Sequence, residues 1–315
     1  MFIPASANTS VDLSVIILTY NTRDLTCACV QSVIADAERT PYTVEIVVVD
    51  NASTDGTVTA LRQATPDVHI IVNASNLGFS RGNNVGLRTA RGRYMMLLNS
   101  DTEIQPDALQ TLIAFMDAHP DAGACGPMLL NADGSLQPSG RPLPSMWTPI
   151  MSMTRLYRLW KRDFYRQAGR DYNAIAKVGE VSGAALLVRR EAYVSVGGLD
   201  PNLFAYYEDI DWCKRIGDAG FSVYYVPGAR VVHYWQSTSR SVSELAYRAG
   251  QNSRRYYYAK HHGPIAHAVI QCLLATKELA LITAATLKRD TTSQQFHRRM
   301  LANVFTALPP PTGSH

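Results

Sequence analysis

The sequence predicts an α/β fold in which helices cover both faces of a mostly parallel central sheet. Apolar runs of strand length, such as SVIIL at 14–18 and EIVVV at 45–49, alternate with segments of helical length. Strands buried on both faces contain continuous runs of Val, Ile and Leu, because helices cover both sides of a parallel sheet. A C-terminal helical extension is expected to follow this domain.

Seven elements are expected in the first hundred residues. Ser53 precedes a helical segment and has a side chain that can cap it. Further along, GEVSGAALLVRR at 179–190 returns to strand character, and the acidic segment after Tyr207 begins a helix that runs to about Asp218. The expected order is strand 14–18, helix 24–37, strand 45–49, helix 54–63, strand 69–72, helix 80–90 and strand 94–98.

Charge divides the chain into two parts. The 315 residues carry a net charge of +4, and their 46% hydrophobic content is enough for a substantial core. Residues 245–315 contain nine Lys or Arg but only two Asp or Glu, so a basic extension follows a body at 1–244. A basic segment rich in Tyr and His is suited to an anionic surface. The sequence favours a membrane surface over nucleic acid, and no nucleic-acid partner is expected.

Cysteine usage and the N-terminus both indicate a cytoplasmic protein. The five cysteines have no spacing typical of a zinc site or a disulfide framework. The segment MFIPASANTS lacks a charged region followed by a long apolar stretch, so no signal peptide is predicted. With a basic extension, this predicts peripheral attachment at the inner face of the plasma membrane.

Three of the expected strands end in polar residues. Ligands of parallel sheets collect outside the carboxyl ends of the strands, so these residues are expected to meet in one crevice. A single Asp or Asn after a strand is more often a turn or capping residue, and the coincidence of three strand ends is what indicates a site. The residues are Thr19, Tyr20 and Asn21 after the first strand, Asp50 and Asn51 after the second, and Asn99, Ser100 and Asp101 after the fourth.

The usual phosphate-binding motifs are missing from the sequence. No G-x-G-x-x-G follows the first strand, and G-x-x-x-x-G-K-[ST] does not occur. A divalent cation held by Asp101 is the simplest alternative, because Mg²⁺ or Mn²⁺ needs only one or two protein ligands when phosphate oxygens and water complete its coordination.

Five ordered motifs, VIILTYN, VVVDNASTDGT, NLGFSRGNNVGL, LLNSDTEI and FAYYEDIDWCKR, occur between about residues 12 and 240. Over this stretch the sequence resembles the inverting family-two glycosyltransferases with a GT-A fold, especially their rhamnosyltransferase-like branch. The resemblance implies a Rossmann-like domain that binds a nucleotide-sugar donor. Five motifs in the family's order are a far more specific signal than one glycine pattern.

The resemblance also implies which residues contact the nucleotide. Asp50 can accept from a base N3–H or a ribose hydroxyl, and Arg81 supplies charge for the diphosphate. Gly78 and Gly82 would let backbone approach the ligand closely. In the alternative, NLGFSRGNN is an ordinary helix start in which Ser80 is the cap. The implied contacts are Thr19, Tyr20, Asn21, Asp50, Asn51, Asn76, Gly78, Arg81, Asn84, Asn99 and Ser100.

A metal site is implied at the NSD segment, which stands where the family has its D-x-D motif. Asn99 replaces the first acid and adds no negative charge, so the cation depends more on Asp101. His233 in RVVHYW stands where family members place a metal-binding histidine. An imidazole ligand favours Mn²⁺, although a histidine after two valines can also be a packed core residue.

The acidic helix supplies the expected catalytic groups. Inverting transfer is a single displacement, so a base must take the proton of the acceptor hydroxyl. Asp209 matches the family's base position, and Glu208 is expected to bind the acceptor or orient the base. Asp211 and Arg215 are expected to form an ion pair on the helix surface. In the alternative, the acids only favour the positive end of the helix.

The C-terminal extension contains an apolar segment at 265–287 that is interrupted by Lys277 and Glu278. Uncharged residues before this interruption are too few for an ordinary spanning helix. His267, Gln271 and Glu278 fall on one helix face, so the segment either lies in a membrane interface or packs on the catalytic domain or on a second copy of the chain. A homo-oligomer therefore remains open.

Taken together, the sequence predicts a metal-dependent inverting hexosyltransferase that uses Mn²⁺ or Mg²⁺. It would move a sugar such as L-rhamnose from a dTDP- or UDP-sugar to a saccharide or lipid-linked saccharide in cell-envelope polysaccharide synthesis. Two alternatives remain: a nucleotidyltransferase, against which TYNTRDL lacks a basic Gly-rich loop, and a non-catalytic nucleotide-sugar-binding protein.

Overall fold

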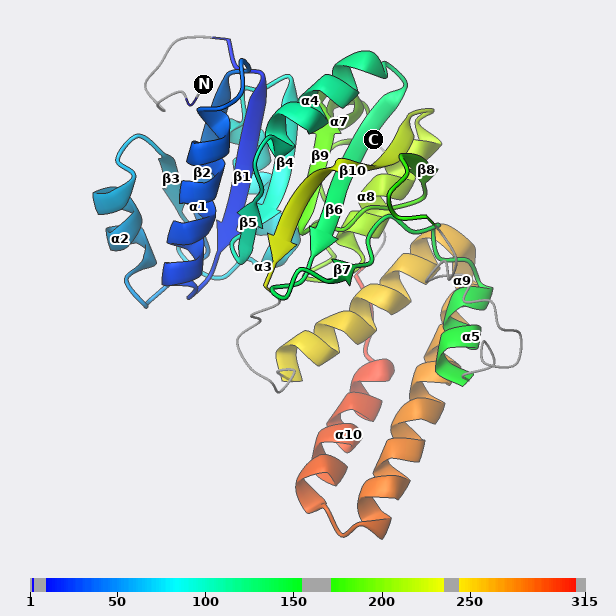
Figure 1. Ribbon diagram of the computed structural model, residues 1–315. Helices are drawn as coiled ribbons and strands as arrows, with labels where there is room; N and C mark the ends of the chain where they lie inside the picture. The colour runs from blue at the N-terminus through cyan, green and yellow to red at the C-terminus, as the bar shows by residue number, and fades with distance from the viewer. Residues whose placement is uncertain (1, 3–9, 155–170, 235–243, 310–315) are drawn as a thin grey trace.

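A mixed, largely parallel sheet forms the centre of the computed structural model (Figure 1), which describes residues 2, 10–154, 171–234 and 244–309. Its strands follow the order β3-β2-β1-β4-β9-β6-β10-β5, with β7 paired to β6 and β8 to β10. They are β1 (Leu13–Thr19), β2 (Val44–Asp50), β3 (His69–Val72), β4 (Tyr94–Asn99), β5 (Thr102–Ile104), β6 (Ala122–Leu130), β7 (Leu136–Gln137), β8 (Ala176–Val178), β9 (Ala185–Arg189) and β10 (Ser222–His233).

Strand direction brings the polar strand ends to one edge of the sheet. β3, β2, β1 and β4 pair in parallel, and β6 pairs in parallel with β10. β9 lies antiparallel between β4 and β6, so its first residue lies at the edge where these strands end. The carboxyl ends of β1, β2, β4 and β10 and the start of β9 therefore share one edge.

Helices cover both faces of the sheet. Val30 of α1 and Leu112 of α4 are buried on one face, and Leu87 of α3, Ala192 of α7 and Trp212 of α8 are buried on the other. These two clusters follow from strands that are apolar on both sides. The helices are α1 (Arg23–Ala37), α2 (Thr57–Ala64), α3 (Gly78–Thr89), α4 (Ala108–Ala118), α5 (Trp147–Thr154), α7 (Arg190–Val196), α8 (Glu208–Asp218), α9 (Glu244–Leu287) and α10 (Thr291–Val304).

The C-terminal helices α9 and α10 extend beyond the end of the sheet where the arrows of β6 and β10 finish (Figure 1). α9 is kinked at Gly263, which has φ 82° and ψ −177° and is followed by Pro264. Its first half packs against Ile210 of α8 through Tyr257 and Tyr258, and its second half packs against α10 through Ile270. The second half of α9 and α10 thus form a helical hairpin, and the first half of α9 joins it to the sheet domain.

The second half of α9 has an unusual distribution of polar residues. Glu278 is fully buried against His297, whereas Ile265, Leu279 and Leu287 are exposed. By length and composition α9 could cross a membrane, and 22% of its most apolar window is buried. The polar face therefore packs on α10 and the first half of α9, and not on the expected catalytic domain or second copy, while an apolar face remains exposed.

One expected helix cap is wrong. Ser53 does not cap α2, which begins at Thr57 after Gly56. The Ser53 hydroxyl instead accepts a hydrogen bond from the Asn21 amide at 2.9 Å, which ties the loop after β2 to the loop after β1. Ser53 thus contacts Asn21, which is distant in the sequence, and makes no capping contact with the neighbouring helix.

Candidate active site

Asp101 and His233 lie side by side at the carboxyl edge of the sheet. β5 pairs antiparallel with β10, and Thr102 lies opposite His233, so the residue before β5 meets the last residue of β10. Asp101 Oδ1 is 3.3 Å from His233 Nε2, and Asn99 Nδ2 is 3.4 Å from the same nitrogen. The structure therefore brings together the two metal ligands expected from sequence, 132 positions apart in the chain.

Gln137 orients the His233 ring. Its Oε1 lies 2.8 Å from His233 Nδ1, and its Nε2 donates to Asn131 Oδ1 at 3.1 Å, which fixes the orientation of the amide. With Nδ1–H donating to Gln137, Nε2 is the ring nitrogen that is available to a cation beside Asp101. This is the arrangement by which neighbouring hydrogen bonds orient a metal-binding histidine.

The donor set fits a divalent cation that is shared with a ligand. One carboxylate and one imidazole supply two ligands, and no group of three or more His, Cys, Asp or Glu suited to a metal occurs among the described residues. Mg²⁺ or Mn²⁺ with two protein ligands leaves positions for water and phosphate oxygens. Asp101 and His233 would hold the cation, and Asn99 would flank it.

Asp209 is held at the same edge by two backbone amides. Gly183 N donates to its Oδ2 at 2.9 Å, and Ile210 N donates to its Oδ1 at 2.8 Å. Burial raises the pKa of Asp209, although these two hydrogen bonds oppose the shift. A carboxylate with a raised pKa is a stronger base, which suits proton abstraction.

A continuous set of contacts links Asp209 to the NSD segment. Gly183 binds Asp209, and the neighbouring Ala184 carbonyl accepts from Asn99 N at 3.0 Å. The small residues before β9 thus separate the expected base from the expected metal pair. A Cβ at Gly183 would lie 3.4 Å from Asp209 Cβ, so a small residue keeps the two segments in contact.

The helix that carries Asp209 begins from an unusual turn. Tyr206 and Tyr207 have φ values of 68° and 69°, a left-handed conformation that is rare for bulky residues and is often found at functional sites. Glu208 follows directly and is buried, and among the described residues its Oε2 has no hydrogen-bond partner. Burial, with the adjacent Asp209 charge, raises the pKa of Glu208 well above its ordinary value.

Asp50, a predicted nucleotide contact, has a buried carboxylate oxygen without a hydrogen-bond partner among the described residues. It is fully buried at the end of β2, and its Oδ2 accepts from Ser53 N at 2.9 Å. Within the described part of the chain, no hydrogen bond reaches its Oδ1. A buried carboxylate oxygen without a donor is costly, so a ligand N–H or hydroxyl is the natural partner. Tyr20 is 47% exposed and directly follows Thr19, the β1 residue that pairs with Asp50, so it offers an aromatic surface at the end of β1.

Other predicted nucleotide contacts are occupied by the protein itself. Thr19 Oγ1 lies 2.8 Å from Thr26 Oγ1, and Ser100 Oγ lies 3.1 Å from Thr22 Oγ1, so these hydroxyls join the loops to α1. Asn21 Oδ1 accepts from the amide of residue 54 at 2.7 Å. These residues shape the crevice from within the protein.

The NLGFSRGNN segment also binds protein groups. Asn84 exchanges two hydrogen bonds with the Leu199 backbone, at 2.7 and 2.9 Å, and Arg81 Nε donates to the Pro201 carbonyl at 3.0 Å. Asn76 Oδ1 accepts from Gly78 N at 2.9 Å and from Asn51 at 3.3 Å. These contacts brace α3 against the segment that leads to the acidic helix.

Two glycines of this segment lie close against protein side chains. A Cβ at Gly78 would lie 2.5 Å from Phe204, and one at Gly82 would lie 2.5 Å from Leu18. Gly78 also has φ +78°. The close approach at these positions is to protein side chains, because α3 packs tightly on β1 and on the segment before α8.

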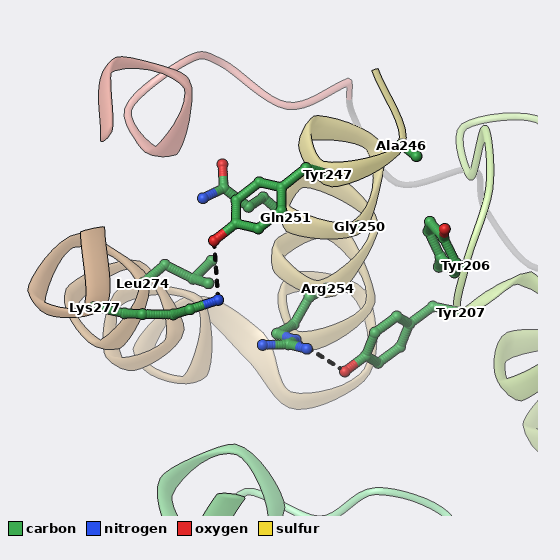
Figure 2. Close-up of a pocket in the computed structure, with 9 residues that line it drawn as sticks. All are labelled: Tyr206, Tyr207, Ala246, Tyr247, Gly250, Gln251, Arg254, Leu274 and Lys277. Atoms are coloured by element: carbon green, nitrogen blue, oxygen red, sulfur yellow. Dashed lines mark hydrogen bonds between the residues drawn. The ribbon is translucent and has the colours of Figure 1, made fainter. Parts of the chain in front are cut away.

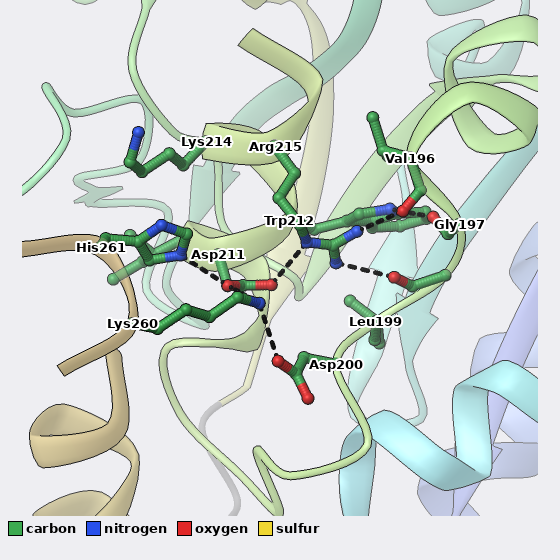
Figure 3. Close-up of polar contacts among 12 residues, drawn as sticks. Val196, Gly197, Leu199, Asp200, Asp211, Trp212, Lys214, Arg215, Lys260 and His261 are labelled. Carbon is green, nitrogen blue, oxygen red and sulfur yellow. Dashed lines mark hydrogen bonds and ion pairs between the residues drawn. The ribbon is translucent and has the colours of Figure 1, made fainter. Parts of the chain in front are cut away.

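Asp211 does not lie on the helix surface, which corrects the expected surface ion pair. It is fully buried, and its Oδ2 accepts from Arg215 at 2.8 Å. Its Oδ1 accepts from Lys260 and His261 of α9, each at 2.7 Å (Figure 3). Lys260 also donates to Asp200 at 2.7 Å. The acid is therefore the centre of a buried cluster that joins α8 to the C-terminal extension.

The fold and the polar residues gathered at this edge of the sheet agree with a GT-A-type glycosyltransferase. The family model for glycosyl transferase family 2 matches residues 14–193, and the chain belongs to this family. Membership decides between the enzyme classes left open by the sequence, in favour of glycosyl transfer over nucleotidyl transfer.

Rhamnosyltransferases are among the similar proteins. The chain is 34% identical to the N-acetylglucosaminyl-diphospho-decaprenol L-rhamnosyltransferase of Mycobacterium tuberculosis (strain ATCC 25618 / H37Rv), over 70% of this chain and 76% of that protein. It is 29% identical to Rhamnosyltransferase WbbL of Escherichia coli (strain K12), over 58% and 70% of the two chains. It is 22% identical to the dTDP-rhamnosyl transferase RfbF of Shigella flexneri, over 76% and 79%.

A solved structure supports the fold. The crystal structure of GalNAc-T7 with UDP, GalNAc and Mn²⁺ superposes with a TM-score of 0.56 at 17% identity. The match covers 81% of this chain and 51% of that chain, so the chain spans about half of the solved protein. At this identity the likeness concerns the fold.

Proposed function

We propose that this enzyme transfers L-rhamnose, with inversion, from a dTDP- or UDP-linked donor to a saccharide carried on a lipid diphosphate. The similar proteins named as rhamnosyltransferases support the sugar, and the decaprenol-linked acceptor in the name of one of them supports the acceptor class. Residues 1–244 would form the catalytic unit and 245–315 the extension. The reaction would belong to cell-envelope polysaccharide synthesis at the inner face of the plasma membrane.

One observation supports the proposal: Gly183 N binds Asp209, and the carbonyl of the next residue, Ala184, binds Asn99 N in the segment that carries Asp101, which lies beside His233. A single displacement needs a base on the acceptor side of the anomeric carbon and charge stabilisation on the leaving-group side. Two separated functions joined by a short backbone segment meet this requirement. No second carboxylic acid is needed to protonate the leaving group, unlike in glycoside hydrolysis.

The residues would divide the work as follows. Asp50 would accept a hydrogen bond from the base or ribose of the donor through Oδ1, and Tyr20 would border the base. Asp209, fixed by the Gly183 and Ile210 amides, would take the proton of the acceptor hydroxyl at Oδ1 or Oδ2. A divalent cation held by Asp101 and His233 would offset negative charge on the departing diphosphate.

The substitution Asp209→Asn tests the base assignment. Asparagine keeps the shape and can still accept at one oxygen, but it cannot take a proton at neutral pH. We expect kcat for rhamnosyl transfer from dTDP-L-rhamnose to fall by about 100-fold or more. Donor affinity measured by calorimetry should change by less than about twofold, because Asp209 is proposed to act on the acceptor hydroxyl and not on the donor.

Asp218→Asn is the matched control, because it removes a carboxylate from the same helix at an exposed ion pair with Lys214. Its kcat should equal that of the wild type. Undiminished nucleotide diphosphate release by Asp209→Asn, with acceptor and donor both saturating, would remove Asp209 from the role of base.

A further inference from the structure

A cavity of about 280 Å³ lies between the turn at Tyr206 and Tyr207, which precedes α8, and the C-terminal extension (Figure 2). Three segments meet here: the left-handed turn before α8, the first half of α9 and the second half of α9 beyond the kink. Ser253 of α9 donates to the Ala205 carbonyl at 2.8 Å, which fixes the helix against the turn. The lining residues are Tyr206, Tyr207, Ala246, Tyr247, Gly250, Gln251, Arg254, Leu274 and Lys277.

Two cationic side chains point into this cavity from the two halves of α9. Arg254 Nε donates to the Tyr207 hydroxyl at 3.1 Å, and Lys277 Nζ donates to the Tyr247 hydroxyl at 2.9 Å (Figure 2). Both cations also lie over tyrosine rings, with 6.0 Å from Arg254 to the Tyr207 centroid and 5.0 Å from Lys277 to the Tyr247 centroid. Tyrosine hydroxyls and rings thus hold the two charges around one cavity.

The described lining residues have positive charge and include no Asp or Glu. Glu278, which follows Lys277 in the chain, is fully buried and already accepts hydrogen bonds from Tyr247 and Gln251 through Oε1 and contacts His297 through Oε2. Partial desolvation lowers the pKa of Lys277; Arg254 adds to this shift, and Glu278 opposes it. An anion in the cavity would offset the repulsion between the two cations.

The cavity adjoins the turn before the proposed base, and the helix that supplies Lys277 also carries exposed apolar residues. Tyr207 stands two residues before Asp209, the proposed base. On the second half of α9, Ile265, Leu279 and Leu287 are exposed, at 78%, 53% and 82%. A ligand that combines a sugar, an anion and a lipid chain has a matching group for each of these three features.

We infer that Arg254 and Lys277 bind the diphosphate of the lipid-linked acceptor, with its sugar directed to Asp209 and its lipid along the exposed face of α9. This inference rests on the proposed function and identifies the acceptor class by its diphosphate. Cationic side chains with tyrosine hydroxyls are suited to phosphate oxygens, because charge-assisted hydrogen bonds are the strong ones. In the proposed function the donor diphosphate would bind at Asp101 and His233, which are residues separate from this cavity.

Two acceptors that differ only in the diphosphate provide the kinetic test. They are N-acetylglucosaminyl-diphospho-farnesol and farnesyl N-acetylglucosaminide, used with the full chain and saturating dTDP-L-rhamnose. For Lys277→Gln we expect KM for the first acceptor to rise about tenfold, or about 1.4 kcal/mol, and KM for the second to stay the same. Lys277→Arg keeps the charge and should restore most of the affinity.

Lys288→Gln is the matched control, since it removes an exposed cation just beyond the end of α9, away from the cavity. It should leave both KM values unchanged. An equal rise for both acceptors in Lys277→Gln would indicate a general structural effect and overturn the inference. So would an equal effect of Lys288→Gln, which would indicate non-specific surface charge.

A binding measurement separates this inference from the proposed function. Farnesyl diphosphate is titrated into the full chain in the presence of a metal chelator, and vesicles of phosphatidylglycerol are tested in parallel. Lys277→Gln should bind farnesyl diphosphate about tenfold more weakly and vesicles equally well.

If the wild type transfers rhamnose to neither acceptor but shows this difference in binding, the proposed function fails and the diphosphate site stands. Equal binding of farnesyl diphosphate by the two proteins would overturn the site. A loss of vesicle binding alone would assign the two cations to phospholipid headgroups and would also overturn it.

Discussion

The substitution Asp211→Asn should destabilise the protein strongly, because it breaks a buried cluster of charges. Its carboxylate is fully buried and accepts from Arg215, Lys260 and His261 at 2.7–2.8 Å. Asparagine keeps the shape, but it removes the charge that balances two buried cations and leaves one acceptor oxygen where there were two. Removing one partner of a buried ion pair costs about 3–5 kcal/mol, and we expect a loss in this range.

Urea denaturation followed by circular dichroism measures this loss as a difference in the free energy of unfolding. Asp218→Asn on the same helix is the reference, because its carboxylate is 60% exposed in an i,i+4 pair with Lys214. Exposed pairs of this type contribute less than about 0.5 kcal/mol. If Asp211→Asn cost no more than Asp218→Asn, the buried cluster would not hold the extension to α8.

The same comparison has a defined dependence on pH. Burial by itself raises the pKa of Asp211, but the hydrogen bond from His261 and the charges of Arg215 and Lys260 outweigh it and hold the pKa below its ordinary value. A lowered pKa means that the stabilisation is present above the unfolded value, about 3.9, and is lost as the pH falls below it. The stability difference between wild type and Asp211→Asn should therefore shrink below about pH 4; a constant difference would contradict the assignment.

Two further substitutions test the metal pair and the packing of α3. Asp101→Asn should weaken Mn²⁺ binding to the donor-free protein by about tenfold or more in calorimetry, by analogy with the effects of other metal-site substitutions. Asp67→Asn, at an exposed position, should leave Mn²⁺ binding unchanged. Equal Mn²⁺ binding by Asp101→Asn and the wild type would exclude Asp101 as a ligand. Gly78→Ala should lower the free energy of unfolding by about 2–4 kcal/mol in urea denaturation, because it adds a clash with Phe204 to an unfavourable φ. Gly56→Ala is the control: its φ is +86° and nothing lies within 4 Å, so the loss should be only about 1–2 kcal/mol. Equal costs would show that Phe204 moves aside freely.

Local patterns were sufficient to predict the first four strands. The runs at 14–18, 45–49 and 94–98 lie within strands Leu13–Thr19, Val44–Asp50 and Tyr94–Asn99, because burial on both faces demands apolar residues without interruption. The polar residues that follow them do share one edge, since parallel pairing follows from helical connections. The antiparallel insertion of β9 between β4 and β6 has no local signal, because it depends on pairing partners far apart in the sequence.

Long-range contacts explain what the sequence could not reveal at the site. Gln137, which orients His233, lies 96 residues away from it in a two-residue strand and carries no motif. The spacing of Asp211 and Arg215 indicated an ion pair but not its burial, since Lys260 and His261 come from α9 almost 50 residues later. A sequence signal did exist in the charge imbalance of 245–315, but it indicated a surface and not a partner for α8.

The buried cluster and the cavity are physically connected, because a single helix contributes to both. Lys260 and Arg254 both belong to the first half of α9, six residues apart, and Ser253 ties this half to the turn before Asp209. The Gly263 kink then returns the chain so that Lys277 faces Arg254 across the cavity. The position of both cations relative to the proposed base therefore depends on the Asp211–Lys260 contact at 2.7 Å. Acceptor affinity should therefore depend on the charge of Asp211, although Asp211 does not contact the acceptor in this proposal.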